Sequence, residues 1–242
     1  MKLASIVPMK NVERTFDGDY AMMLTHLAKY YPKRKDLPYA SRQCYRILDN
    51  SLIELGGAVD MEQLIEAAEM CEADEIILPD VFKDDTATLK SVMQAIEWLD
   101  DHQLKHTYRL MAVCQGDTPE EFERCFRTLE SFPSIHCIGI PKVTETIHPL
   151  GRPGFEYLWQ GSPKAIHLLG CWSSLTELRE YAHPSHIRSV DTCIPALNAL
   201  TGRGIWQERT RERTIDLIND NLRTCGGPYD LALTALRGQD LL

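Results

Sequence analysis

Short apolar runs typical of β-strands alternate with amphipathic helical segments along most of this 242-residue chain. Alternation of this kind predicts parallel strands joined by right-handed crossovers. The strand candidates are residues 3–9, 45–50, 75–80, 108–115, 135–141, 165–171 and 187–194. This number of strands, in a chain close to the ~250 residues of such barrels, favours an α/β fold of the TIM type, a (β/α)8 barrel, over an open doubly wound sheet. An eighth strand is not evident; we expect it near residues 11–20 or close to the C-terminus, unless the barrel is irregular and lacks it.

Three of the segments between these runs carry clear helix signals. Residues 60–71 and 85–101 place apolar side chains at helical spacing, and Asp60 with Gln63 resembles a capping box. At 118–121, a threonine cap is followed by a proline and, at the third helical position, a glutamate, and residues 174–177 repeat the cap-and-glutamate part of this pattern. No linker, repeat or low-complexity segment interrupts the chain, which predicts a single domain over residues 1–242. The lack of a GxGxxG or P-loop motif argues against a dinucleotide- or nucleotide-dependent enzyme.

The eight cysteines are scattered and form no CxxC or CxC pair, so the sequence predicts neither a metal site nor a redox motif. Several lie in apolar runs, as reduced thiols do in the cores of cytosolic proteins. No stretch has the length of a membrane span, and the N-terminal apolar run is too short for a signal peptide. We therefore expect a cytoplasmic protein with no membrane partner and no cofactor.

The net charge of −9 argues weakly against a nucleic-acid partner. However, residues 60–101 hold 13 acids and only two lysines, so the remainder of the chain is slightly basic. Local basic clusters, rather than the total charge, decide whether phosphates are bound. We single out Arg34, Arg42 and Arg203 as candidate phosphate contacts; the alternative is that they are solvated surface charges.

Polar side chains stand at the carboxyl ends of four of the expected strands. They are Asp49, Asp80, the Gln115–Gly116 pair and Asp191. In a parallel barrel these ends converge on one face, where active sites are built. Clustered carboxylates suit proton transfer or the stabilisation and trapping of an oxocarbenium-like sugar. The alternative, for each aspartate alone, is a helix cap or a turn residue.

Six stretches at the ends of the expected strands resemble, in order, the strand ends of the tRNA-guanine transglycosylase superfamily over residues 45–205. The stretches are LDN at 48–50, ILPD at 77–80, VCQG at 113–116, CIGI at 137–140, HLLGC at 167–171 and VDTCIP at 190–195. The stretch ILDNSLIELG also resembles the short phage-type, DpdA-like members, which insert 7-deazaguanine bases such as 7-cyano-7-deazaguanine into DNA. The resemblance implies a glycosyltransferase with a TIM barrel that exchanges guanine for a free 7-deazaguanine.

The resemblance also implies roles for individual residues. Asp191 matches the nucleophile that attacks the anomeric carbon and holds the nucleoside as an ester, and Asp49 matches a general acid/base. Asp80 matches the aspartate that accepts hydrogen bonds from the N–H groups of the base. The implied substrate-binding set is completed by Gln115 and Gly139 at the carbonyl edge of the base, with Gly116 and Asn50 beside them.

Two departures from the family pattern bear on the substrate. The tRNA enzymes carry a C-terminal CxCxxC…H zinc site, and this sequence has no such spacing, which favours DNA over tRNA. Pro195-Ala-Leu also replaces the usual Pro-Thr-Arg, and Arg203 is a candidate substitute for that arginine. Three alternatives stay open: tRNA as the substrate, a non-catalytic barrel that binds bases or nucleic acid, and a hydrolase of N-glycosidic bonds.

Overall fold

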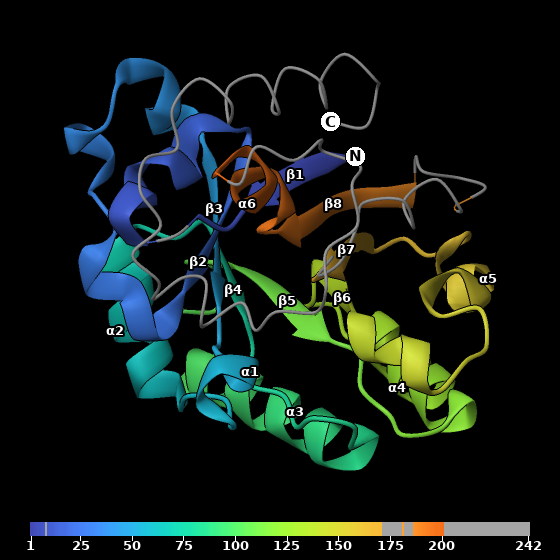
Figure 1. The fold of residues 1–242 in the computed structure, drawn as a ribbon. Coiled ribbons are helices and arrows are strands. Elements are labelled where there is room, and N and C mark those ends of the chain that lie inside the picture. The colour runs from blue at the N-terminus through green and yellow to red at the C-terminus, as the bar shows by residue number, and fades with distance from the viewer. Residues whose placement is uncertain (8, 171–180, 182–185, 201–242) are drawn as a thin grey trace.

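The computed structural model describes residues 1–7, 9–170, 181 and 186–200, and they form a closed barrel of eight parallel strands in sequential order (Figure 1). The expected α/β architecture, a TIM-type (β/α)8 barrel, is confirmed. The strands are β1 (Lys2–Ser5), β2 (Tyr20–Leu24), β3 (Tyr45–Asp49), β4 (Glu75–Ile77), β5 (Arg109–Val113), β6 (Cys137–Pro141), β7 (Ala165–Leu169) and β8 (Ile187–Thr192).

The helices of the middle crossovers begin where the sequence signals indicate. Asp60, Asp84 and Thr118 each accept a hydrogen bond from a backbone N–H three residues later, which satisfies a donor of the first helical turn. The α-helices are α1 (Leu52–Leu55), α2 (Met61–Cys71), α3 (Asp85–Asp101), α4 (Pro119–Ser131), α5 (Glu156–Trp159) and α6 (Ile194–Leu200). The segment at 174–177 lies outside the described residues.

The eighth strand is β2, which overlaps the expected position at 11–20 only at Tyr20. Residues Met9–Asp17 form a 3₁₀ helix, and the strand begins only at Tyr20. It pairs with β1 and β3 and closes the barrel between them. The crossovers on either side of β2 contain 3₁₀ helices rather than α-helices, at Met9–Asp17, Thr25–Tyr30, Arg34–Asp36 and Tyr39–Gln43. Further 3₁₀ helices at Lys142–Thr146 and Arg152–Phe155 lie between β6 and β7.

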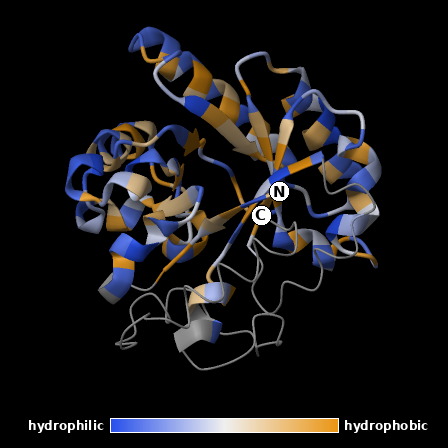
Figure 2. Cartoon of the chain, turned by 90° about the horizontal axis from the view of Figure 1, so that it is seen from above, coloured by the Kyte–Doolittle hydropathy of each residue, from blue (hydrophilic) through white to orange (hydrophobic). Residues whose placement is uncertain are grey.

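Apolar strands form the centre of the molecule, and the surrounding helices carry both hydrophilic and hydrophobic segments (Figure 2). Met22, Ile47 and Met111 are fully or almost fully buried, as expected for the layered interior of a parallel barrel. The interior also encloses polar side chains, among them His167 and Glu75. These buried polar groups require hydrogen-bond partners, and their partners lead to the site described below.

The described cysteines are consistent with core thiols: Cys44, Cys71, Cys114, Cys125 and Cys137 are all buried. Burial raises the pKa of Cys44 and of Cys71 to about 12, which makes these thiols poor nucleophiles at neutral pH. Of the helices in the described part of the chain, none is long and apolar enough to cross a membrane.

Candidate active site

A pocket of about 830 Å³ opens at the carboxyl ends of the strands. Asp49 is the last residue of β3, Asp80 follows β4, Gln115 follows β5, and Asp191 lies in β8. The structure brings these four side chains together with Asn50 in the lining of this one pocket. A volume of this size lies within the range of small-molecule sites. The strand-end residues singled out from the sequence therefore share one cavity, whereas their individual roles stay predictions.

Asp80 is buried between two side-chain amides that hold its carboxylate in a fixed orientation. The Nδ2 group of Asn50 donates to Oδ1 at 2.7 Å, and the Nε2 group of Gln115 donates to Oδ2 at 2.6 Å. The amides are fixed in turn, because Asn50 Nδ2 also donates to the carbonyl of Leu78 and Gln115 Oε1 accepts from the Lys83 N–H. Burial raises the pKa of Asp80 to about 6, and the two amide hydrogen bonds oppose this shift. At neutral pH the carboxylate is therefore an acceptor with capacity left for a ligand.

Asp49 lies among like charges. Its Oδ2 accepts the backbone N–H of Ser51 at 2.9 Å, and Ser51 has the left-handed backbone (φ 59°) that turns the chain into α1. Burial is the largest cause that raises the pKa of Asp49 well above its ordinary value, followed by the charge of Glu54. Asp191 and Asp80 push the pKa in the same direction. A carboxyl in this setting holds its proton more tightly than an exposed one, which suits a general acid.

Asp191 is positioned by two donors that both reach the same oxygen. The N–H of Gly170 donates to Oδ1 at 2.9 Å, and Nε2 of His167 lies 3.2 Å from it. His167 is fully buried on β7, and its Nδ1 lies 2.7 Å from the Ser189 hydroxyl on β8. Burial lowers the pKa of His167, although Asp191 opposes the shift. The imidazole is consequently neutral at neutral pH.

Glu54, Lys142 and His167 are candidate functional residues that the sequence reasoning missed. Glu54 lines the pocket from α1, and burial together with the charge of Asp191 raises its pKa. Lys142 also lines the pocket and forms an ion pair with Glu145. A signal for Glu54 exists in the sequence, since Ser51 and Glu54 have the spacing of a capping box at a helix start.

The two predicted glycines are not in the pocket lining, and packing explains both. A Cβ on Gly139 would lie 2.9 Å from Leu169 and 3.3 Å from Val113, two residues that line the pocket. A Cβ on Gly116 would lie 2.6 Å from the backbone nitrogen of Phe122 in α4. Gly116 therefore requires glycine, because the backbone of α4 cannot move aside, whereas at Gly139 the contacts are to the ends of flexible side chains. Their contact with a base stays a prediction.

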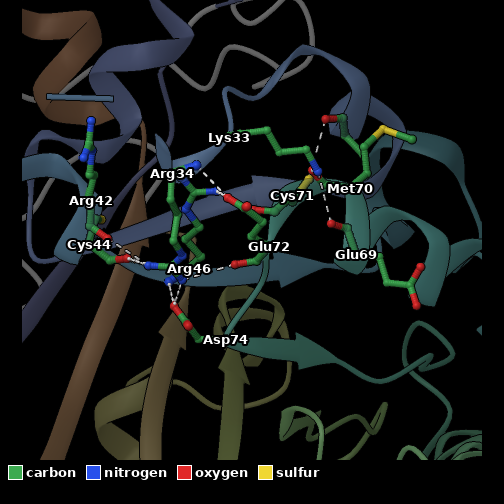
Figure 3. Close-up of polar contacts among 11 residues, drawn as sticks. Lys33, Arg34, Arg42, Cys44, Arg46, Glu69, Met70, Cys71, Glu72 and Asp74 are labelled. Carbon is green, nitrogen blue, oxygen red and sulfur yellow. Dashed lines mark hydrogen bonds and ion pairs between the residues drawn. The ribbon is translucent and has the colours of Figure 1, made fainter. Parts of the chain in front are cut away.

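Two of the three predicted phosphate contacts, Arg34 and Arg42, lie at the end of the barrel opposite this pocket. Arg34 donates to the carbonyls of Arg42, Cys44 and Glu72 and to the Asp74 carboxylate (Figure 3). Cys44 and Asp74 directly precede β3 and β4, so this cluster is at the amino ends of the strands, opposite the pocket. Arg42 donates to the carbonyls of Leu37 and Lys35. Arg203 lies outside the described residues, and phosphate binding by all three arginines stays a prediction.

Within residues 1–7, 9–170, 181 and 186–200, no group of three or more His, Cys, Asp or Glu side chains is arranged to hold a metal ion. The acids of the pocket take their hydrogen bonds from amides, backbone N–H groups and an imidazole. What the pocket can do is accept hydrogen bonds from a ligand, carry a proton and present a carboxylate nucleophile. No protein-family model matches the chain, and no curated protein is significantly similar to it in sequence.

Proposed function

We propose that this pocket exchanges a guanine base in a nucleic acid, DNA in the first instance, for a free 7-deazaguanine through a covalent ester of Asp191. The observation that carries the proposal is the opposition of two aspartates across one cavity. In a closed barrel of eight strands in sequential order, β4 and β8 face each other. Asp80, just after β4, and Asp191, on β8, therefore lie on opposite sides of the pocket.

The chemistry of Asp80 fits the edge of a guanine-like base. Guanine and 7-deazaguanine both present a ring N–H beside an exocyclic NH₂, a pair of donors that matches the two oxygens of one carboxylate. The side-chain amides of Asn50 and Gln115 already hold those oxygens in place. With the base edge at Asp80, the bond between base and sugar extends toward Asp191 on the opposite wall.

The reaction then proceeds in two balanced displacements. In the first, an oxygen of Asp191 bonds to C1′ while the bond from C1′ to the guanine nitrogen breaks, and the electron pair leaves with guanine. Asp49, whose pKa burial raises, supplies the proton that lets guanine leave as a neutral base. In the second, the incoming base attacks C1′, the ester to Asp191 breaks, and Asp49 takes up the N–H proton of that base. Two displacements retain the configuration of the sugar.

DNA is the favoured substrate because the stretch at 47–56 resembles the phage-type enzymes. The target base must leave the stack to enter the pocket, and extrusion costs a few kcal/mol in a duplex but little in a single strand. The accessible form of the substrate is therefore single-stranded or locally opened DNA. A tRNA with an unpaired guanine has the same chemistry and is the competing substrate.

The experiment is incubation of the purified full-length chain with isotopically labelled 7-cyano-7-deazaguanine and each of three substrates: single-stranded DNA, duplex DNA and tRNA. Nucleosides are then analysed by mass spectrometry after enzymatic digestion. We expect the label in DNA nucleosides, most rapidly in the single strand, and none with Asp191→Asn. Label in tRNA alone would move the substrate to RNA. Abasic sites without label would indicate a hydrolase, and binding without either product would indicate a non-catalytic barrel.

A further inference from the structure

The strand β8 contains one extra residue at the point where it pairs with β7. Ile187 pairs with Ile166, but the next residue of β7, His167, pairs with Ser189, so Arg188 has no partner in the register. A bulge of this kind redirects a side chain, and bulges are frequent beside active sites. Arg188 here forms an ion pair at 2.7 Å with Glu75, the fully buried first residue of β4. Its guanidinium thus reaches across the barrel interior.

From Arg188 a chain of hydrogen bonds runs up the barrel to Asp191. Nε of Arg188 donates to the Ser189 hydroxyl at 3.1 Å, and that hydroxyl lies 2.7 Å from Nδ1 of His167. Nε2 of the same ring lies 3.2 Å from Oδ1 of Asp191. At the amino ends of the strands, Tyr45 of β3 donates its hydroxyl proton to Glu75 at 2.7 Å. The path thus connects β3 with His167 of β7, on the opposite side of the barrel.

The direction of each hydrogen bond follows from what each group can donate. An ionised Asp191 only accepts, so the ring nitrogen that faces it, Nε2, carries the proton. A neutral imidazole then has an acceptor at Nδ1, which takes the proton of the Ser189 hydroxyl. That leaves the serine oxygen free to accept from Arg188, a group that only donates. All three bonds agree on one tautomer of His167.

We propose that His167 is a positioning residue for Asp191, held by Ser189 and the bulged Arg188 as the neutral Nε2–H tautomer so that Oδ2 is directed at the sugar. This role rests on the proposed function. His167 and the Gly170 N–H both bind Oδ1, which prevents the carboxylate from rotating. When the bond from Oδ2 to C1′ forms, His167 keeps its proton, and the same two donors stabilise the carboxylate when the ester later breaks. Groups that orient a reactive side chain in this way affect turnover rather than substrate affinity.

The first test reads the tautomer in the free protein by ¹⁵N NMR of labelled histidine side chains, with the His167 signals assigned by their loss in His167→Gln. The expected spectrum has a protonated Nε2 and an unprotonated Nδ1, and the ring stays neutral at pH 6.5, where an ordinary histidine is half protonated. A ring protonated on Nδ1, or on both nitrogens at pH 7.5, would overturn the inference whatever the protein catalyses.

The second test measures base exchange in three variants. His167→Leu is expected to lower kcat by roughly 10- to 100-fold with unchanged KM for DNA and base, as for other orienting partners. His167→Gln, which places an amide N–H near the position of Nε2, is expected to recover most of that loss. His136→Leu is the matched control, because His136 directly precedes β6 at the amino end of the barrel, where its Nδ1 accepts the Leu110 N–H. Full kcat in His167→Leu would contradict the positioning role. Absence of exchange in the wild type would instead refute the proposed function, while the NMR result still decides the tautomer.

Discussion

The two ends of the barrel treat charge in opposite ways. At the amino ends of β3 and β4, opposite charges are paired: Arg34 with Asp74, and the fully buried Arg46 with Glu72 (Figure 3). At the carboxyl ends, Asp49, Asp80 and Asp191 share one pocket and are held by amides, backbone N–H groups and an imidazole. The first arrangement neutralises charge, whereas the second concentrates charge of one sign.

The difference indicates which end of the molecule is under functional constraint. Removing one partner of a buried ion pair is costly, because it leaves the other charge uncompensated. Buried carboxylates gathered without paired cations cost stability and are retained where a ligand or a reaction needs them. The amino end is therefore the structural end of the barrel, and removing acids should have opposite effects on stability at the two ends.

Among the variants that compare the two ends, Asp49→Asn should give the largest effect on chemistry and, in the same protein, a rise in stability. Loss of a general acid slows exchange by roughly 10²–10⁴-fold. The raised pKa of Asp49 means that the folded state binds this proton more tightly than the unfolded state, so the charged form opposes folding as the pH increases. We therefore expect a higher Tm than wild type at pH 8, measured by calorimetry.

The advantage of Asp49→Asn should disappear toward acid pH, where the wild-type carboxyl is protonated in both states. A lower Tm than wild type at pH 8, with the fold intact, would show that Asp49 stabilises the carboxyl end, and the contrast between the two ends would fail.

Asp80→Asn should weaken base binding. Loss of a charge-assisted pair of hydrogen bonds costs on the order of 2–4 kcal/mol, or roughly 30- to 700-fold in the affinity for 7-cyano-7-deazaguanine. Because the pKa of Asp80 is about 6, wild-type affinity should also fall as the pH drops below that value, since a protonated carboxyl accepts one donor fewer. Titration calorimetry with the free base from pH 5 to 8 measures both. Affinity that is independent of pH and unchanged in the variant would make Asp80 a turn residue.

At the other end, Asp74→Asn should lower stability and leave base affinity unchanged. Asp74 accepts from the Arg34 guanidinium at 2.5 Å and from the Arg46 backbone N–H at 2.8 Å. Both groups are partly exposed, so the expected loss is only about 1–2 kcal/mol, a decrease of a few degrees in Tm. A change in base affinity of more than twofold would connect the two ends and remove the contrast.

Arg34→Gln should give the smallest effect on nucleic-acid binding. The Arg34 guanidinium already donates to four groups of the chain, so we expect the salt dependence of DNA affinity to keep its slope while the Tm falls. A slope reduced by about one unit would instead support the phosphate contact that the sequence suggests.

The barrel could be predicted from the sequence because buried parallel strands and capped helices leave strong local signals. The strand β2 was not predicted because YAMML lacks β-branched residues and is flanked by 3₁₀ helices rather than by capped α-helices. Such a strand is identified by its pairing with the neighbouring strands β1 and β3 rather than by a local sequence pattern.

The site could be predicted in part for the same reason. Asp49, Asp80 and Asp191 stand at recognisable strand ends, and the parallel fold then brings them together. The path from Glu75 through Arg188 to His167 could not be found in this way, because a single extra residue in β8 decides that Arg188 points inward. Nor does the spacing of Arg34 and Arg42 show that their donors are satisfied by backbone carbonyls.

The most direct test of the account is to trap the ester and locate it. Single-stranded DNA is incubated with the protein and a slowly released guanine analogue, the mixture is denatured, and the surviving protein–DNA adduct is digested and sequenced by mass spectrometry. We predict a deoxyribose-linked peptide modified at Asp191 in the wild type and no adduct in Asp191→Asn, whose amide is a poor nucleophile. An adduct at another residue, or one that persists in Asp191→Asn, would contradict the account.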